Sequence, residues 1–186
     1  MTVEDVFSNI STHMIRGIMI HEQLANYYDF LGLKGYKRCH EYHYLCESVN
    51  YRKLHRYYIN HFNKLIPEKD IENVSLIPMS WYRYKRDDVD TNTRRNAVKT
   101  GIESWVAWES ETKDMYEKAY KDLFEMGEVA AALKIACFLD DADRELKHAN
   151  RKHVHLLSID YDSIAIAEEQ CQIHDKYERM VGKSVI

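Results

Sequence analysis

Apolar residues recur every three or four positions along most of this chain, which is the spacing of helices that are buried along one side. The long stretches with this pattern are residues 3–30, 34–65, 91–126 and 128–157, followed by a shorter one at residues 163–180. The chain has only two prolines, and both lie in the one long stretch without a helical period, residues 66–90. The pattern predicts an all-α protein.

The links between these helices specify how they are arranged. The first and second helices are joined by a few residues, and so are the third and fourth at Gly127, so each pair forms an antiparallel hairpin. Residues 66–90 must then span the length of the bundle, and the second and third helices run the same way. One long crossover predicts a ferritin-like four-helix bundle with a short fifth helix at the C-terminus. We expect one domain over residues 1–186.

The inner stripe of the second helix is polar in its middle. Its members are Tyr36, Cys39, His43, Glu47, Asn50, Leu54, Tyr57 and Leu65. A buried carboxylate costs several kcal/mol unless it is paired, protonated or metal-bound. Glu109 of the third helix and Glu145 of the fourth also lie on or beside inner stripes, at about the same level. Two interpretations remain open, a metal site and a metal-free hydrogen-bond network.

Histidines near these carboxylates offer nitrogen ligands. His43 is one turn from Glu47, and the short first link brings His21 to the same level. Glu145 and His148 are three residues apart, which places both on one helical face. Oxygen and imidazole donors together suit iron, manganese or zinc. The predicted metal ligands are Glu47, Glu109, Glu145, His43, His21 and His148.

Several short segments resemble the bacterial non-haem ferritins, over roughly residues 10–175. LKGY at residues 33–36 is similar to the LPGF-like turn between that family's first two helices, and KLHRYYI at residues 53–59 to its KFYDYI-like continuation. AWESE at residues 107–111 resembles the family's HE, and LKIACFLDDADRELK at residues 133–147 its LQWFVEEQVEEE. On this register Glu47, Glu109 and Glu145 fall on the family's site carboxylates.

The resemblance implies a protein that binds, oxidises or stores iron, with ferroxidase-type activity, oxygen or peroxide as oxidant, and a symmetric shell of subunits. Glu109 would bridge metal ions, and Glu47 and Glu145 would be terminal ligands. Three positions depart from the family pattern: Asn50 replaces its site histidine, Met14 its first-helix glutamate, and Ala142 its glutamine or glutamate. The implied centre is therefore incomplete, with His43 or His21 supplying the missing nitrogen.

Charge and cysteine usage limit the other classes of function. The formal net charge is -4, so no basic surface supports nucleic-acid binding. The four cysteines form no CxxC pair, which favours reduced thiols and a cytoplasmic protein. No stretch reaches the ~20 apolar residues of a membrane span.

Aromatic residues support an alternative function, a metal-free scaffold that binds another protein through a surface rich in tyrosine and tryptophan. Trp81, Tyr82 and Tyr84 of the crossover are candidates for it, because interfaces are enriched in such residues. A second set is expected at the edges of the inner stripes, where it would form an apolar patch for a homodimer or a larger shell. Its members are Ile15, Ile18, Tyr27, Tyr44, Tyr51, Tyr58 and Trp108.

Overall fold

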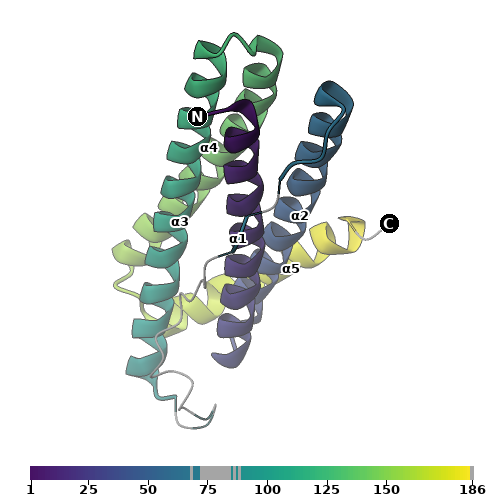
Figure 1. Cartoon of the computed structure of the whole chain (residues 1–186). Helices are drawn as coiled ribbons and strands as arrows, with labels where there is room; N and C mark the ends of the chain where they lie inside the picture. Colours follow the sequence, from purple (N-terminus) through teal and green to yellow (C-terminus); the bar gives the residue numbers. More distant parts are fainter. Residues whose placement is uncertain (68, 72–84, 86, 88, 185–186) are drawn as a thin grey trace.

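The computed structural model of the chain describes residues 1–67, 69–71, 85, 87 and 89–184, with only the helical backbone for residues 181–184. Its helices are α1 (Val3–Phe30), α2 (Lys34–Phe62), α3 (Thr91–Glu125), α4 (Val129–Ser158) and α5 (Ser163–Ser184). The chain folds as two antiparallel hairpins, and α2 and α3 run in the same direction (Figure 1). The predicted all-α class and topology are confirmed. The expected interface residues Trp81, Tyr82 and Tyr84 lie outside the described residues.

Local signals end the helices close to where the sequence predicts. The side chain of Asp90 accepts a hydrogen bond from the backbone N–H of Thr93 and so caps α3. Gly127 follows α3 with φ +82°, a left-handed conformation that glycine adopts without strain. Helix α2 is shorter than predicted, because Asn63 takes a left-handed conformation with φ 53°. Leu65, expected on the inner stripe, is consequently 76% exposed.

The apolar core consists of two clusters at opposite ends of the bundle. One cluster takes its α1 residues from Ile20 onward, and the other takes them from Met14 backward. The same break occurs on α2 between Cys39 and Leu54, and on the remaining two helices of the bundle. The predicted polar positions lie at this break. The bundle therefore has a polar layer between two apolar halves.

Three aromatic residues expected on the outer surface are instead part of the core. Tyr27, Tyr58 and Trp108 are 4%, 1% and 4% exposed. Tyr27 donates a hydrogen bond to the carbonyl oxygen of Ala97 on α3, so its hydroxyl is satisfied inside the protein. The prediction of an aromatic surface patch is wrong for these three residues.

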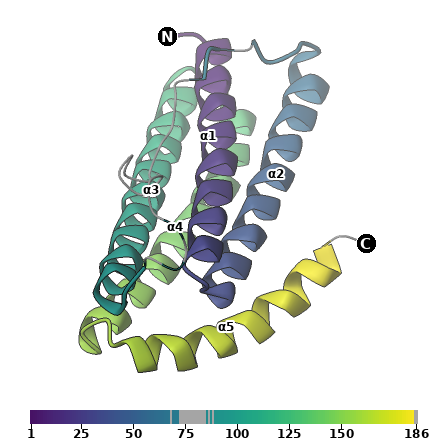
Figure 2. The same ribbon diagram turned by 90° about the horizontal axis from the view of Figure 1, so that it is seen from below.

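Helix α5 crosses the open end of the bundle beneath α1 and α2 (Figure 2). It packs closely against α2. The phenol of Tyr36 donates a 2.6 Å hydrogen bond to Glu169 of α5, and Tyr177 of α5 is buried against Tyr42 and His43. Among the described residues, no helix is long and apolar enough to span a membrane.

Gly35 allows α5 to approach the start of α2, because a Cβ at this position would collide with the backbone carbonyl of Gln170. We expect Gly35→Ala to displace α5 and to lower the free energy of unfolding by about 1–3 kcal/mol, as overpacking does. Thermal unfolding measures this change, with Lys34→Ala at the exposed neighbouring position as the control. Equal melting temperatures for the two variants would contradict this close helix crossing.

Candidate metal centre

The polar layer gathers side chains from all four helices of the bundle. His21 comes from α1, His43 and Glu47 from α2, Glu109 from α3, and Glu145 with His148 from α4. Helical periodicity puts each of these residues on or beside the inner stripe of its helix. The stripes meet inside the bundle, and these residues lie at the level where the two apolar clusters separate. His21, His43 and Glu109 are at most 3% exposed. All six residues predicted from the sequence thus lie at this break in the core.

Three of these residues form a compact group at the edge of the layer. The Oε2 atom of Glu145 lies 3.3 Å from Nδ1 of His43 and 3.9 Å from Nδ1 of His148. One ligand atom from each residue can be chosen so that all three atoms lie within 4.8 Å of one another. Two imidazoles and one carboxylate at these separations can enclose a single metal ion after small rotations of the side chains.

Two buried atoms of this group have no hydrogen-bond partner among the described residues. They are Nε2 of His43 and Oε2 of Glu145, and the two imidazoles near this oxygen contact it but form no hydrogen bond with it. Buried polar atoms are almost always paired, and leaving one unpaired costs about 1–3 kcal/mol. Buried nitrogen and oxygen atoms without a hydrogen-bond partner are expected where a protein binds a ligand.

Glu109 is more deeply buried than Glu145, on the apolar stripe of α3, and it contacts two other side chains of the protein. Its Oε1 atom accepts a 2.8 Å hydrogen bond from the indole N–H of Trp105 and lies 3.6 Å from Nε2 of His21. This oxygen is therefore an acceptor with two neighbours. Glu109 can orient the surrounding rings as well as attract a cation.

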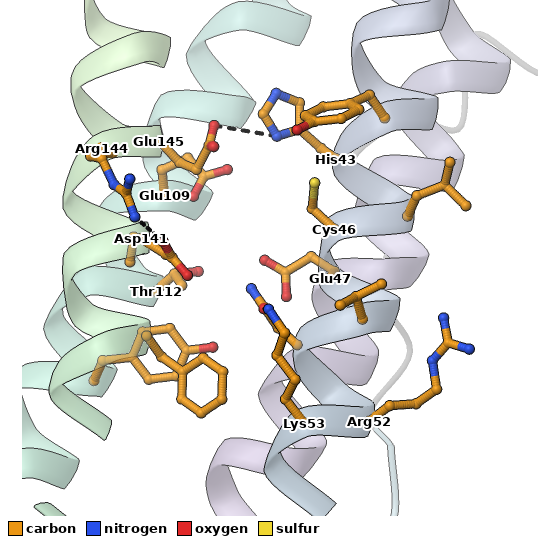
Figure 3. A pocket seen from close by; sticks show the side chains of 17 residues that line it. His43, Cys46, Glu47, Arg52, Lys53, Glu109, Thr112, Asp141, Arg144 and Glu145 are labelled. Carbon is orange, nitrogen blue, oxygen red and sulfur yellow. Dashed lines mark hydrogen bonds and ion pairs between the residues drawn. The ribbon is translucent and has the colours of Figure 1, made fainter. Parts of the chain in front are cut away.

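A cavity of about 400 Å³ separates α2 from α4 at this level. Glu47 points into it from α2, opposite Glu145 and Asp141 of α4 (Figure 3). Arg144 is paired with Asp141 at its edge. The other lining residues are Tyr42, His43, Leu45, Cys46, Val49, Asn50, Arg52, Lys53, Glu109, Thr112, Tyr116, Phe138 and Ala142. The cavity gives the carboxylates of the layer access to small ligands.

Burial changes the ionisation of these carboxyl groups. It raises the pKa of Glu109 to about 8 and that of Glu47 to about 7, and in both cases the charges of neighbouring carboxylates add to the effect. Burial also opposes ionisation of Glu145, but the imidazoles of His148 and His43 outweigh it and lower its pKa. At neutral pH the metal-free layer therefore holds one firmly ionised carboxylate beside two that retain protons readily.

His43 and His21 are uncharged at neutral pH. Burial lowers the pKa of His43 to about 4, although the charge of Glu145 acts in the opposite direction. The pKa of His21 is also well below its usual value, because this ring is fully buried next to other imidazoles. Neutral imidazole is the form that binds metals, so no proton has to leave these rings first.

Solved structures with the same arrangement of helices include archaeal ferritins. An open pore ferritin from Archaeoglobus fulgidus is 12% identical, with a TM-score of 0.76, and an engineered closed form of that ferritin is 12% identical, with a TM-score of 0.75. A humanized archaeal ferritin is 13% identical, with a TM-score of 0.76. Each match covers 92% of this chain and 94% of the other.

The chain has a ferritin-like fold. No protein-family model matches the sequence, and no curated protein matches it in a sequence comparison. The expected fold resemblance is thus confirmed by three-dimensional structure, while the metal site of this ferritin-like bundle stays a prediction.

The three departures from the ferritin motif all lie on the side of Glu47 away from α5. Met14 and Ala142 are buried in the apolar cluster at that end, and Asn50 lines the cavity half-exposed. The histidines lie on the opposite side of Glu47, toward α5. The histidines of the layer and the three departures from the expected motif therefore lie at different levels along the bundle.

Sequence reasoning missed His40, a fully buried residue of the layer. Its Nδ1 lies 3.2 Å from Nδ1 of His21, and its ring packs against those of Tyr28 and Trp105. The available signal was the three-residue spacing from His43, which puts both rings on one side of α2. Asp141 and Trp105 were also missed as members of the site.

The raised pKa of Glu109 predicts how stability depends on pH. Between pH ~4.5 and ~8 folded Glu109 keeps a proton that the unfolded carboxyl group has lost, so this group makes the free energy of unfolding fall as the pH rises. Above pH ~6.5, where unfolded histidines are already neutral, this effect dominates. Below pH ~6.5 the buried histidines, with lowered pKa values, make stability fall as the pH drops. We expect Glu109→Gln to reduce the alkaline loss by on the order of 1–2 kcal/mol.

Urea unfolding at pH 6.5 and pH 8, in the presence of a chelator, measures this difference. Glu103→Gln is the matched control, because Glu103 is exposed on the same helix. A parent protein whose stability is unchanged between the two pH values would show that Glu109 is already ionised at neutral pH.

Proposed function

We propose that this ferritin-like protein binds Fe(II) as a substrate at the polar layer between α2 and α4 and oxidises it. The observation that carries the proposal is the convergence of His43, Glu145 and His148 beside a 400 Å³ cavity. Two nitrogen donors and one carboxylate form a ligand set that suits non-haem Fe(II), with manganese and zinc as competitors. The similarity to archaeal ferritins supports iron as the ion.

The residues of the layer have separate roles in this function. His43 and His148 offer ring nitrogen atoms, and the ionised Glu145 supplies negative charge beside them. Glu47 and Glu109 carry protons more readily than ordinary carboxyl groups, and losing them would compensate the charge of an arriving cation. Each bound Fe(II) gives up one electron, and oxygen or peroxide is the oxidant that resemblance to ferritins implies.

Metal titration of protein purified without chelator tests the proposal. We expect close to one Fe(II) ion per chain under anaerobic conditions, and release of protons as the metal binds. His148→Gln and Glu145→Gln should each weaken binding by at least ~10-fold, because each removes one of the three converging donors. Calorimetry measures both the affinity and, in buffers of different ionisation enthalpy, the protons released.

His155→Gln is the matched control for His148→Gln. His155 lies on the same helix but is exposed and faces Glu169 of α5, away from the cavity. The His155→Gln variant should bind Fe(II) as tightly as the parent protein does. Sub-stoichiometric metal in the parent under all conditions would refute the proposed function and favour the metal-free scaffold. Equal affinities for all variants would mean that the site is misplaced.

We also infer that the chain forms homo-oligomers, a dimer or a larger shell, through the outer faces of α1 and α2. Ile15, Ile18, Tyr44 and Tyr51 remain partly exposed there, and Met19 is 36% exposed. Similarity to ferritins that are described as open pore and closed forms supports assembly.

Light scattering at micromolar concentration should give at least twice the mass of one chain. Met19→Glu should shift the distribution toward smaller species, because it places a charge in the contact. A strictly monomeric parent protein would contradict assembly through this surface.

A further inference from the structure

His40 is the most deeply buried histidine that the proposed ligand set does not use. It lies one turn before His43 on α2 and has no exposed surface. Its Nδ1 contacts His21, but its Nε2 has no hydrogen-bond partner among the residues that the structure describes. A ring nitrogen fixed in the core without a partner requires a physical explanation.

The neighbours of His40 determine which of its nitrogens carries hydrogen. Oε1 of Glu109 accepts a hydrogen bond from Trp105 and lies 3.6 Å from Nε2 of His21, a contact that favours the tautomer with hydrogen on this Nε2. In a neutral imidazole the other nitrogen is then an acceptor. With this tautomer, Nδ1 of His21 accepts the 3.2 Å hydrogen bond from Nδ1–H of His40. This leaves Nε2 of His40 as a bare lone pair.

The relay Glu109–His21–His40 has the arrangement that commonly supports metal-binding histidines. A carboxylate or another acceptor holds one ring nitrogen, which fixes the tautomer and orients the second nitrogen toward the ion. His43 also has an unpartnered Nε2, while its Nδ1 lies 3.3 Å from Oε2 of Glu145. Two imidazoles on adjacent turns of α2 thus each have a buried nitrogen atom without a hydrogen-bond partner among the described residues.

The ring of His40 lies next to the proposed ligand group, but its nitrogen atoms are outside the set of ligand atoms that lie within 4.8 Å of one another, so joining the site requires its side chain to rotate. The ring centroids of His40 and His43 are 6.2 Å apart, which nearly equals the 6.1 Å between His43 and His148. The indole of Trp105 contacts all three rings at centroid distances of 5.0–5.4 Å. His40 is therefore about as near to His43 as the third member of the proposed ligand set is.

We propose that His40 is a further metal ligand, which contributes its Nε2 atom so that three imidazoles and the carboxylate of Glu145 hold the ion. This inference rests on the proposed metal site and extends it. A site with three nitrogen donors favours Fe(II), Co(II) and Zn(II) over Mn(II) and Mg(II), which prefer oxygen. Ion selectivity would then come from α2, the helix that contributes two of the three rings.

X-ray absorption spectroscopy of the full-length protein loaded with Zn(II) tests the ligand count directly. The extended fine structure should show three imidazoles in the parent protein and two in His40→Gln. Zn(II) affinity, measured by calorimetry, should fall by at least ~10-fold in His40→Gln and stay unchanged in His155→Gln. The count in the parent protein needs no variant, so it remains decisive if His40→Gln fails to fold.

The outcomes separate this inference from the proposed function. Two imidazoles in the parent protein, or a His40→Gln variant with unchanged affinity, would overturn the role of His40. The site itself would still stand in that case if His148→Gln weakens binding. A parent protein that binds no Zn(II), Co(II) or Fe(II) would refute both.

A substitution at Glu109 tests the relay Glu109–His21–His40 independently. Glu109→Gln keeps the shape of the side chain but weakens the anchor of His21, so it should lower Zn(II) affinity about 10-fold and leave three imidazoles in the spectrum. A Zn(II) affinity in Glu109→Gln equal to that of Glu103→Gln, the exposed control on the same helix, would contradict the relay.

Discussion

The structure depends on one costly feature, a layer of carboxyl and imidazole groups enclosed between two apolar clusters. Removing such groups from water is unfavourable unless they are neutral or paired. In this protein most of the buried groups are kept neutral, and they are not paired with oppositely charged Lys or Arg side chains of the described residues. Glu47 and Glu109 have raised pKa values, His21 and His43 have lowered ones, and the ionised Glu145 lies between two imidazoles. Neutralisation is thus distributed over the whole layer.

The packing of the helices explains why this layer is accessible. Close contacts join α1 to α2, α3 to α4, α1 to α3, and α2 to α5. The cavity occupies the remaining side of the bundle, between α2 and α4 (Figure 3). The apolar clusters hold the two ends together, so this gap can persist at the polar level. A four-helix bundle with a continuous apolar core would have no reason to keep such an opening.

Most of the fold could be predicted from the sequence, because one periodic stripe determines each of α1, α3 and α4. The predicted stripe residues of α3, from Ile102 through Glu109 to Leu123, are all buried. Helix α2 was harder to interpret because it packs against both α1 and α5 and therefore has two buried faces. A single stripe captures His43 but not His40. Residues such as Tyr27 also mislead, since the long phenol reaches a carbonyl oxygen inside the protein.

The candidate site could be predicted only as a set of residues at one level. Helical spacing places Glu145 and His148 on one face, but the choice of tautomer and of ring nitrogen depends on contacts across helices. Which atoms remain unpartnered is a property of the packed structure. For this reason His40 and the acceptor role of Glu109 emerge only from the three-dimensional arrangement.

The docking of α5 has a consequence for the chemistry of the layer. Tyr177 of α5 packs against the ring of His43, and Glu169 of α5 holds the phenol of Tyr36 one turn before His40. The C-terminal helix therefore forms part of the wall that keeps water from the imidazoles. Whatever loosens this helix also hydrates the rings, so a contact at the end of the chain can tune the reactivity of a site built almost entirely by the other four helices.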